Sequence, residues 1–260
     1  MTDELLDLAV TAARAAGALL RGRCVEPRTG VGTKSSGTDM VSDADRAAEA
    51  LIFSGIRDAR PDDAILGEES GEAGGSTGLR WVVDPLDGTT NFLFGIPHWA
   101  VSIACEDGEG AILGVIYDAL RDELFCARRG EGATLNDTPI LASRKEDLGD
   151  ALVATGFSYR PGEREMAARA LGGIIARVRD VRRAGAASLD LAWVACGRLD
   201  GYYETPIEHW DVAAGTLLVT EAGGRTGSIP GIAGEGEGLV AAGSELFEGL
   251  RALVSKHLFA

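Results

Sequence analysis

The stretch Trp81-Val82-Val83-Asp84-Pro85-Leu86-Asp87-Gly88-Thr89-Thr90-Asn91-Phe92 joins a short hydrophobic run to a turn that carries two carboxylates. The run is typical of a buried strand, and Pro85 ends the hydrogen bonding of that strand. The turn can therefore point Asp84 and Asp87 to one side. Carboxylate oxygens at this spacing suit Mg²⁺ or Mn²⁺, and Asp84 can bridge two ions. The backbone N–H groups of residues 88–90 are suited to holding phosphate oxygens.

Two further acidic clusters lie upstream and downstream of this stretch. Glu68 belongs to Gly67-Glu68-Glu69-Ser70, directly after an apolar pair, and Asp211 follows Glu204 and Trp210 in the C-terminal half. Each cluster alone has a structural explanation, because charged residues usually lie on the surface and aspartate is a common helix N-cap residue. Their order and spacing together indicate one site that is assembled from distant segments.

The hydrophobic periodicity changes along the chain. It predicts two N-terminal helices, the second beginning with a capping box of Ser42 and Asp45, which gives Asp45 a purely structural alternative role. The middle of the chain carries short β-rich runs between Gly and Asp turns and predicts a largely antiparallel sheet. We expect loops at 26–38 and 71–78. The predicted helices span 3–20, 42–60, 163–179, 186–196, 211 onward and 245–258, and the predicted strands 81–83, 100–105, 112–117, 124–127, 202–204 and 239–242.

The composition limits the classes of partner. Lys and Arg total 25 against 40 Asp and Glu, so the 260-residue chain has a formal net charge of -15. Such a field repels polyanions, so we expect no nucleic-acid partner, and an anionic substrate would need bound divalent cations. No apolar run is long enough for a membrane helix, so we expect no membrane contact. The acidic start and four cysteines without a Cys-x-x-Cys pair favour a cytoplasmic protein.

Two motifs carry a resemblance to a known family. The stretch from Trp81 to Phe92 resembles the first signature of the inositol monophosphatase family of metal-dependent phosphomonoesterases, and Trp210-Asp211-Val212-Ala213-Ala214-Gly215 with Glu221-Ala222-Gly223-Gly224 resembles the second. The loop from Lys34 to Asp45 also matches in order. The resemblance covers essentially the whole chain. It implies an α/β fold with layers in an α-β-α-β-α sandwich, a single unit over 1–260 with approximate lobes 1–145 and 146–260, and a homodimer.

The resemblance also implies roles for particular residues. It gives Glu68, Asp84 and the Leu86 carbonyl to a first Mg²⁺, and Asp84, Asp87 and Asp211 to a second, with a weaker third ion near Glu68 and Mn²⁺ as an alternative metal. Glu68 and Thr89, the latter hydrogen-bonded to Asp45, would orient and deprotonate the attacking water. The substrate would contact Asp87, Gly88, Thr89, Thr90, Ala187, Glu204 and Asp211.

The expected activity is hydrolysis of a small phosphate monoester, with inositol 1-phosphate as the substrate and Li⁺ as an inhibitor. Thr90-Asn91 favours inositol phosphate over the alternatives, which are fructose 1,6-bisphosphate, histidinol phosphate and 3'-phosphoadenosine 5'-phosphate. A hypothesis of another class is a regulatory protein that binds the transcription machinery; the intact set of acids favours the enzyme. We assign His98 and His209 structural roles and leave Arg182-Arg183 outside the site.

Overall fold

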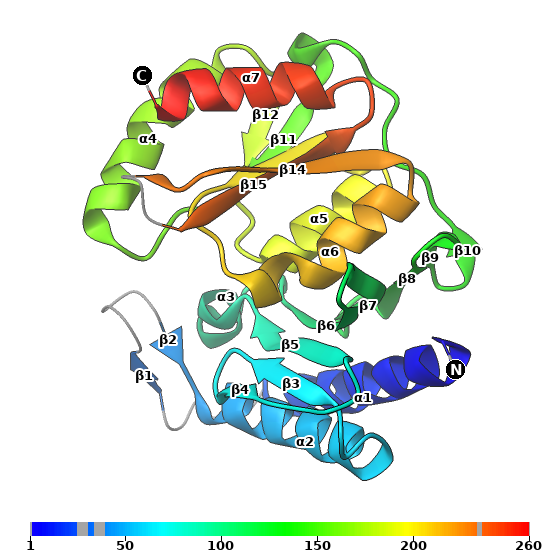
Figure 1. Cartoon of the computed structure of the whole chain (residues 1–260). Helices are drawn as coiled ribbons and strands as arrows, with labels where there is room; N and C mark the ends of the chain where they lie inside the picture. Colours follow the sequence, from blue (N-terminus) through cyan, green and yellow to red (C-terminus); the bar gives the residue numbers. More distant parts are fainter. Residues whose placement is uncertain (1, 25–30, 34–39, 233–235, 260) are drawn as a thin grey trace.

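Alternating layers of helices and sheets make up the molecule, a computed structural model that describes residues 2–24, 31–33, 40–232 and 236–259 (Figure 1). Helices α1 (Thr2–Arg23) and α2 (Asp43–Ala59) form the first layer and pack on one face of the larger sheet. Both begin with acidic residues, which the helix dipole favours, and bury one apolar face. The predicted capping box is present, since the Asp45 carboxylate accepts a hydrogen bond from the Ser42 backbone N–H at 2.9 Å.

The second layer is an eight-stranded sheet in the order β10-β9-β8-β7-β6-β5-β3-β4. All neighbouring strands are antiparallel except β3 and β5, which are parallel, so the prediction of a largely antiparallel sheet is confirmed. The strands are β3 (Ala64–Gly67), β4 (Gly71–Ala73), β5 (Arg80–Asp87), β6 (Ala100–Asp107), β7 (Gly110–Asp118), β8 (Glu123–Arg128), β9 (Gly132–Leu135) and β10 (Thr138–Pro139).

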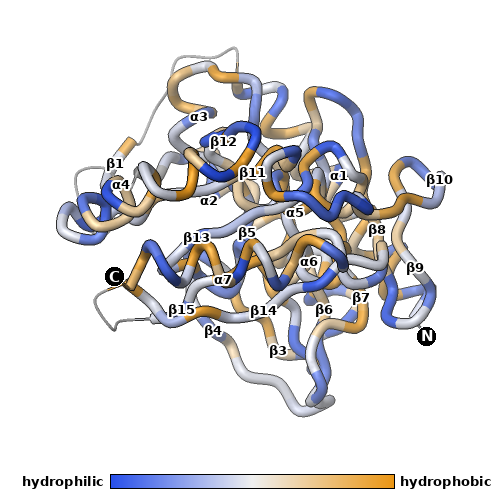
Figure 2. Tube along the Cα trace, turned by 90° about the horizontal axis from the view of Figure 1, so that it is seen from above, coloured by the Kyte–Doolittle hydropathy of each residue, from blue (hydrophilic) through white to orange (hydrophobic). Residues whose placement is uncertain are grey.

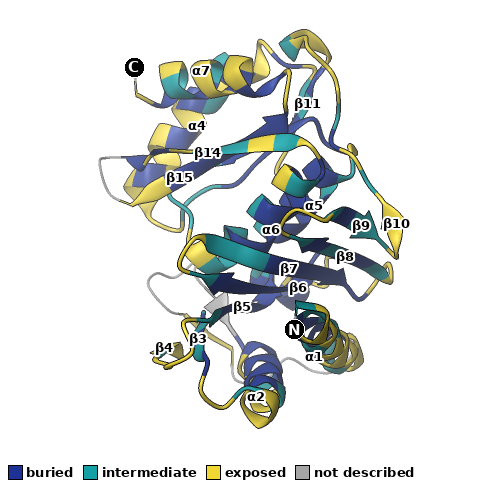
Figure 3. Ribbon diagram, turned by 45° about the vertical axis from the view of Figure 1, so that its right-hand side comes forward, coloured by how far each residue is buried: buried dark blue, intermediate teal, exposed yellow. Residues whose placement is uncertain are grey.

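The third layer separates the two sheets. Helices α5 (Ala187–Ala195) and α6 (His209–Glu221) are apolar on most sides, because they pack against β5 to β8 below and against β13 to β15 above (Figure 1). Figure 3 shows these helices and the central strands as the most buried part of the molecule. Short α3 (Thr89–Phe94) follows β5 directly.

The remaining layers complete the α-β-α-β-α sandwich and confirm the expected fold class. The second sheet has the order β12-β11-β13-β15-β14, and α4 (Pro161–Ile175) and α7 (Phe247–Leu258) cover its outer face. Along α7, hydrophobic and hydrophilic residues alternate as an amphipathic surface helix requires (Figure 2). These strands are β11 (Leu152–Thr155), β12 (Asp180–Arg182), β13 (Gly201–Glu204), β14 (Gly224–Pro230) and β15 (Glu237–Gly243). A two-stranded ribbon, β1 (Gly32–Thr33) with β2 (Met40–Val41), lies apart from both sheets.

Three local predictions need correction. The expected loop at 71–78 begins with edge strand β4, because the backbone of residues 71–73 pairs with the outer side of β3. The helix expected to reach Arg179 ends at Ile175, and β12 starts at Asp180. Helix α6 begins at His209 rather than at Asp211, which is its third residue. Most of the loop expected at 26–38 lies outside the described residues.

Candidate active site

The end of β5 places the first two carboxylates of the site. Pairing between β5 and β6 shifts register between Asp84 and Asp87, and the intervening Pro85 cannot donate to the ladder. Both aspartates are almost completely buried. Gly88 then turns the chain into α3 with φ 95°, a left-handed conformation in which a Cβ atom would also lie 3.0 Å from the His98 carbonyl oxygen. No side chain caps α3, and Gly88 and Thr89 at its start line the pocket.

Strand β3 brings Glu68 to the same edge. Because β3 and β5 are parallel, their carboxyl ends lie together, and the Glu68 N–H donates to the Val83 carbonyl oxygen at 3.2 Å. The buried carboxylate of Glu49 in α2 holds the following turn. It accepts a hydrogen bond from the Glu69 N–H at 2.9 Å and another from the Ser70 hydroxyl. Glu68 therefore lines the pocket at a fixed place beside Asp84.

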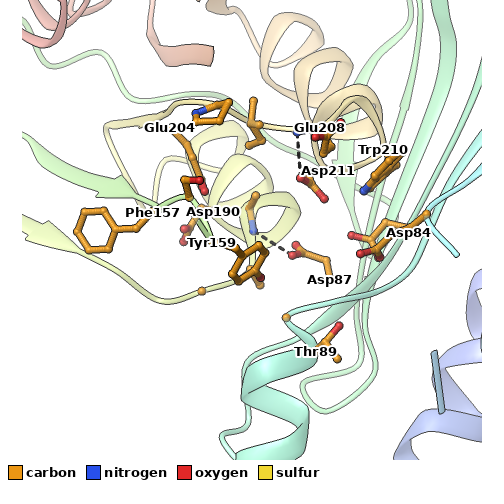
Figure 4. Close-up of a pocket in the computed structure, with 18 of the residues that line it drawn as sticks. Asp84, Asp87, Thr89, Phe157, Tyr159, Asp190, Glu204, Glu208, Trp210 and Asp211 are labelled. Carbon is orange, nitrogen blue, oxygen red and sulfur yellow. Dashed lines mark hydrogen bonds between the residues drawn. The ribbon is translucent and has the colours of Figure 1, made fainter. Parts of the chain in front are cut away.

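Asp211 reaches the pocket from the first turn of α6. Its carboxylate accepts a hydrogen bond from the Glu208 N–H at 3.3 Å, and its side chain points toward Asp84 and Asp87 (Figure 4). Burial raises the pKa of Asp84 and Asp211 well above the usual value, and repulsion from the other acids of the cluster raises it further. Burial also raises the pKa of Asp87. The acids that the sequence analysis grouped thus face one another.

The start of α5 holds Asp87 from the opposite side. The Ala187 N–H donates to Oδ1 at 3.2 Å, and the Ser188 N–H and hydroxyl donate to Oδ2 at 2.7 and 2.5 Å. These hydrogen bonds lower the pKa of Asp87 against the effect of burial. Ala186, the N-cap residue of α5, has no side-chain acceptor, so Asp87 supplies the cap from a distant strand.

The acid cluster fits divalent cations by the chemistry of its donors. Four carboxylates, those of Glu68, Asp84, Asp87 and Asp211, and the Leu86 backbone border one pocket, and their mutual repulsion is of the kind that hard cations offset. In the present side-chain positions, no three His, Cys, Asp or Glu residues of the described chain converge around a single metal position. Hydrogen bonds from the start of α5 hold the Asp87 oxygens in their present positions.

The predicted pair Thr89 and Asp45 is in place. The Thr89 hydroxyl donates to Asp45 Oδ1 at 2.8 Å, although residues 45 and 89 belong to different elements. Thr89 lines the pocket, whereas Thr90 is not among its lining residues. Gly88 and Ala187 do border it.

The whole pocket has a volume of about 570 Å³. Its far end is lined by other residues than the acid cluster. Glu204 at the end of β13 accepts a hydrogen bond from the Tyr202 hydroxyl at 2.6 Å, and burial raises its pKa to about 7. Asp190 and Arg183 also line this end. Asp190 was not predicted as a site residue, and Arg183, which we expected outside the site, lines the pocket. One signal was available for Asp190, since it is the single charged residue of an otherwise apolar helix.

The two histidines near the pocket have the structural environments that we expected. His98 is buried, and burial lowers its pKa to about 4. His209 Nε2 lies 2.8 Å from Glu106 Oε1, which ties the start of α6 to β6. Neither residue is among those that line the pocket.

Comparisons with known proteins agree with this geometry. A family model described as the inositol monophosphatase family matches residues 1–258. The chain is 44% identical to the Nus factor SuhB of Xylella fastidiosa over 86% of this chain and 82% of that protein, and 42% identical to the Nus factor SuhB of Escherichia coli over 87% and 86%. No helix in the described ranges is long and apolar enough to cross a membrane.

Solved structures match over nearly the full length. The extragenic suppressor protein suhB from Bartonella henselae superposes with a TM-score of 0.90 at 40% identity, covering 97% of this chain and 99% of that chain. An inositol monophosphatase from Anabaena gives a TM-score of 0.84 at 37% identity and covers 98% and 96%. With the fold, the acid cluster and these matches in agreement, the chain belongs to the inositol monophosphatase family.

Proposed function

We propose that this protein hydrolyses small phosphate monoesters with the help of bound divalent cations, Mg²⁺ or alternatively Mn²⁺. The observation that carries the proposal is the gathering of Glu68, Asp84, Asp87 and Asp211 at one end of a pocket, directly beside the uncapped start of α3. When bound there, two or three divalent ions would neutralise the phosphate charge and lower the pKa of the attacking water. The residues that would hold them are Glu68, Asp84, Asp87, Asp211 and the Leu86 carbonyl.

The chain's own residues have distinct tasks in this proposal. The backbone N–H groups of Gly88, Thr89 and Thr90 bind the phosphate oxygens, because a helix start presents unpaired donors. The Thr89 hydroxyl donates a hydrogen bond to Asp45, so its oxygen can accept a hydrogen bond from water. When that water gives its proton to the Thr89 oxygen, the hydroxyl proton passes on to Asp45. Together with Glu68, this pair orients the water and draws its proton away.

For the substrate we propose inositol 1-phosphate, with use of other polyol and sugar phosphates. Glu204 supports this assignment, because it is a carboxyl group that lines the far end of the pocket, away from the acid cluster. Ala186 supports a broad range of substrates, because the alanine side chain has no hydroxyl group that could bind the ring of a substrate. Fructose 1,6-bisphosphate, histidinol phosphate and 3'-phosphoadenosine 5'-phosphate stay as alternatives.

The test is a panel of these four phosphates, assayed for kcat/KM with Mg²⁺ and with Mn²⁺. Inositol 1-phosphate should give the highest value, and chelation of the metal should abolish the release of phosphate. A preference for fructose 1,6-bisphosphate or 3'-phosphoadenosine 5'-phosphate would overturn the substrate assignment. Activity that survives the chelator would overturn the metal requirement. The homodimer belongs to the same proposal and is supported by exposed apolar side chains at Phe94 and Ile96. Analytical ultracentrifugation would measure the molecular mass in solution and so test for the homodimer.

A second candidate function comes from the relatives named Nus factor SuhB. This name points to a role in transcription. It conflicts with our expectation that the protein has no nucleic-acid partner, and we therefore drop that expectation. Under this alternative the chain would bind a component of the transcription machinery. Asp84→Asn separates the two functions: it should abolish hydrolysis, whereas a partner interaction independent of catalysis should survive the change in a pull-down from cells.

A further inference from the structure

A buried carboxylate outside the acid cluster contacts the turn that carries Glu68. Glu49 lies on the buried face of α2 and is 2% exposed. Among the described residues, no Lys, Arg or His forms an ion pair with it, and its polar contacts are two hydrogen bonds. Burial of a charge without a cationic partner is costly. Packing alone therefore does not account for a carboxylate at this position.

Both hydrogen bonds come from the turn after β3. The Glu69 N–H donates to Glu49 Oε2 at 2.9 Å, and the Ser70 hydroxyl donates to Oε1. Gly67 allows this close approach, because a Cβ atom there would overlap Glu49 Oε2. Two donors of a single turn thus meet the two oxygens of a group that can only accept. A glutamine at position 49 would turn its NH₂ group toward one of these donors.

These contacts fix the backbone on both sides of Glu68. The Glu68 N–H donates to the Val83 carbonyl oxygen at 3.2 Å, and the N–H of the next residue donates to Glu49. Because peptide groups are planar, holding the two that flank the Glu68 Cα restricts both of its backbone dihedrals. The direction in which the Glu68 side chain leaves the backbone is therefore set by β5 on one side and by α2 on the other.

Helix α2 also holds the second group that we propose to orient the attacking water. Asp45 and Glu49 are four residues apart on α2, so they lie on the same buried face of the helix. Asp45 accepts the hydrogen bond from the Thr89 hydroxyl at 2.8 Å, while Glu49 holds the turn of Glu68. One helix therefore sets the positions of Thr89 and Glu68 relative to each other.

We propose that Glu49 is a positioning residue for the cation site, which fixes the Glu68 turn so that Glu68 and Asp84 can bind the same divalent cation. The inference rests on the proposed metal-dependent phosphatase function. Glu49 does not line the pocket, so it acts through Glu68 and not as a ligand itself. Residues that orient a metal ligand in this way typically contribute about 10- to 100-fold to metal affinity.

Glu49→Gln tests the proposal, with isothermal titration calorimetry of Mg²⁺ binding as the main measurement. The affinity for Mg²⁺ should fall about tenfold or more, because the direction of Glu68 is no longer fixed. Hydrolysis of p-nitrophenyl phosphate, which has no ring hydroxyls, gives a second readout. Its kcat should return to within about threefold of the unaltered protein at saturating Mg²⁺, because all the proposed metal ligands are still present.

Asp118→Asn is the matched control. Asp118 is also a buried carboxylate that accepts hydrogen bonds from a turn, from the Leu120 N–H at 3.0 Å and the Arg121 N–H at 3.1 Å, but it does not line the pocket. Both variants should lower the melting temperature in a chelator, because each removes a buried acceptor. Only Glu49→Gln should weaken the binding of Mg²⁺.

Ser70→Ala decides the question if Glu49→Gln does not fold. Ser70 is exposed, so its loss should not disturb the core, and it supplies one of the two donors that hold Glu49. Loss of this single hydrogen bond should weaken Mg²⁺ binding about twofold or more.

The outcomes separate this proposal from the broader one. An unchanged affinity for Mg²⁺ in Glu49→Gln, or in Ser70→Ala where the first variant does not fold, would overturn the positioning role. Equal weakening in Asp118→Asn would overturn it in favour of a general loss of stability, and so would a loss of kcat that saturating Mg²⁺ does not restore. Absence of both Mg²⁺ binding and Mg²⁺-dependent hydrolysis in the unaltered protein would instead defeat the phosphatase function itself.

Discussion

The Thr89 hydroxyl lies 2.8 Å from Asp45 Oδ1 and 3.2 Å from the Leu86 carbonyl oxygen. A hydroxyl has one proton, and the shorter contact to a carboxylate is the stronger. Ser42 donates its backbone N–H at 2.9 Å and its hydroxyl at 2.5 Å to the other Asp45 oxygen, which fixes that carboxylate. The Thr89 oxygen is therefore oriented to accept a hydrogen bond.

Removal of the Thr89 hydroxyl should slow the chemical step. We expect Thr89→Ala to lower kcat by about 100-fold, the usual size of a general acid–base contribution, with little change in KM. Thr89→Ser keeps the hydroxyl and should stay within about tenfold of the unaltered protein. Steady-state kinetics with inositol 1-phosphate measures both, and equal losses in the two variants would assign Thr89 to packing instead.

Glu204 should affect substrate choice rather than catalysis. Because it accepts a hydrogen bond from Tyr202 and lies away from the acid cluster, Glu204→Gln should lower kcat/KM for inositol 1-phosphate while p-nitrophenyl phosphate stays nearly unchanged. One neutral hydrogen bond corresponds to about 0.5 to 1.5 kcal/mol, or a loss of roughly two- to twelvefold. A loss of the same size on both substrates would mean that Glu204 supports the fold or the metals.

The metal-free protein should lose stability as the pH rises. Burial raises the folded-state pKa of Glu204 from 4.5 to about 7, and the pKa values of Asp84 and Asp211 are raised as well. The folded state therefore binds more protons than the unfolded state, so this contribution is complete below pH 4.5 and is lost as the pH rises through about 7. Thermal unfolding in a chelator at several pH values measures it, and Glu204→Gln should flatten the dependence. A melting temperature that rises over this interval would contradict the prediction.

Lithium should inhibit hydrolysis at tens of millimolar by competing for the position of the second cation, as the family resemblance implies. The measurement is phosphate release at fixed Mg²⁺ with added LiCl, and NaCl at the same concentration is the control for ionic strength. Insensitivity to LiCl would weaken the inositol phosphatase assignment without removing phosphatase chemistry.

Much of this architecture is present in local sequence patterns. The strand before Asp84, the capping box at Ser42 and the apolar helix at 187–195 all follow from residues that are adjacent in the chain. Edge strand β4 could not be predicted, because Gly71–Ala73 has no strand pattern and pairs only through the backbone of β3. Arg183 was missed for a related reason: it meets Phe157, which follows β11 and lies far away in the sequence, only in the folded chain.

Substitution of Asp84 or Asp211 should stabilise the metal-free fold. Asp84 and Asp211 repel the other acids of the cluster, and burial adds to the cost of their charges. We therefore expect Asp84→Asn and Asp211→Asn to raise the melting temperature in a chelator. A decrease would mean that these carboxylates contribute to packing or hydrogen bonding more than to repulsion.

The most direct test of the account is Mg²⁺-dependent release of phosphate from inositol 1-phosphate by the unaltered protein and by Asp84→Asn. The account predicts activity that requires Mg²⁺ in the first and almost none in the second, although circular dichroism shows both to be folded. It is contradicted if Asp84→Asn retains more than about a tenth of kcat, since a deficit of ~1.4 kcal/mol is too small for the loss of a carboxylate that would hold a metal ion.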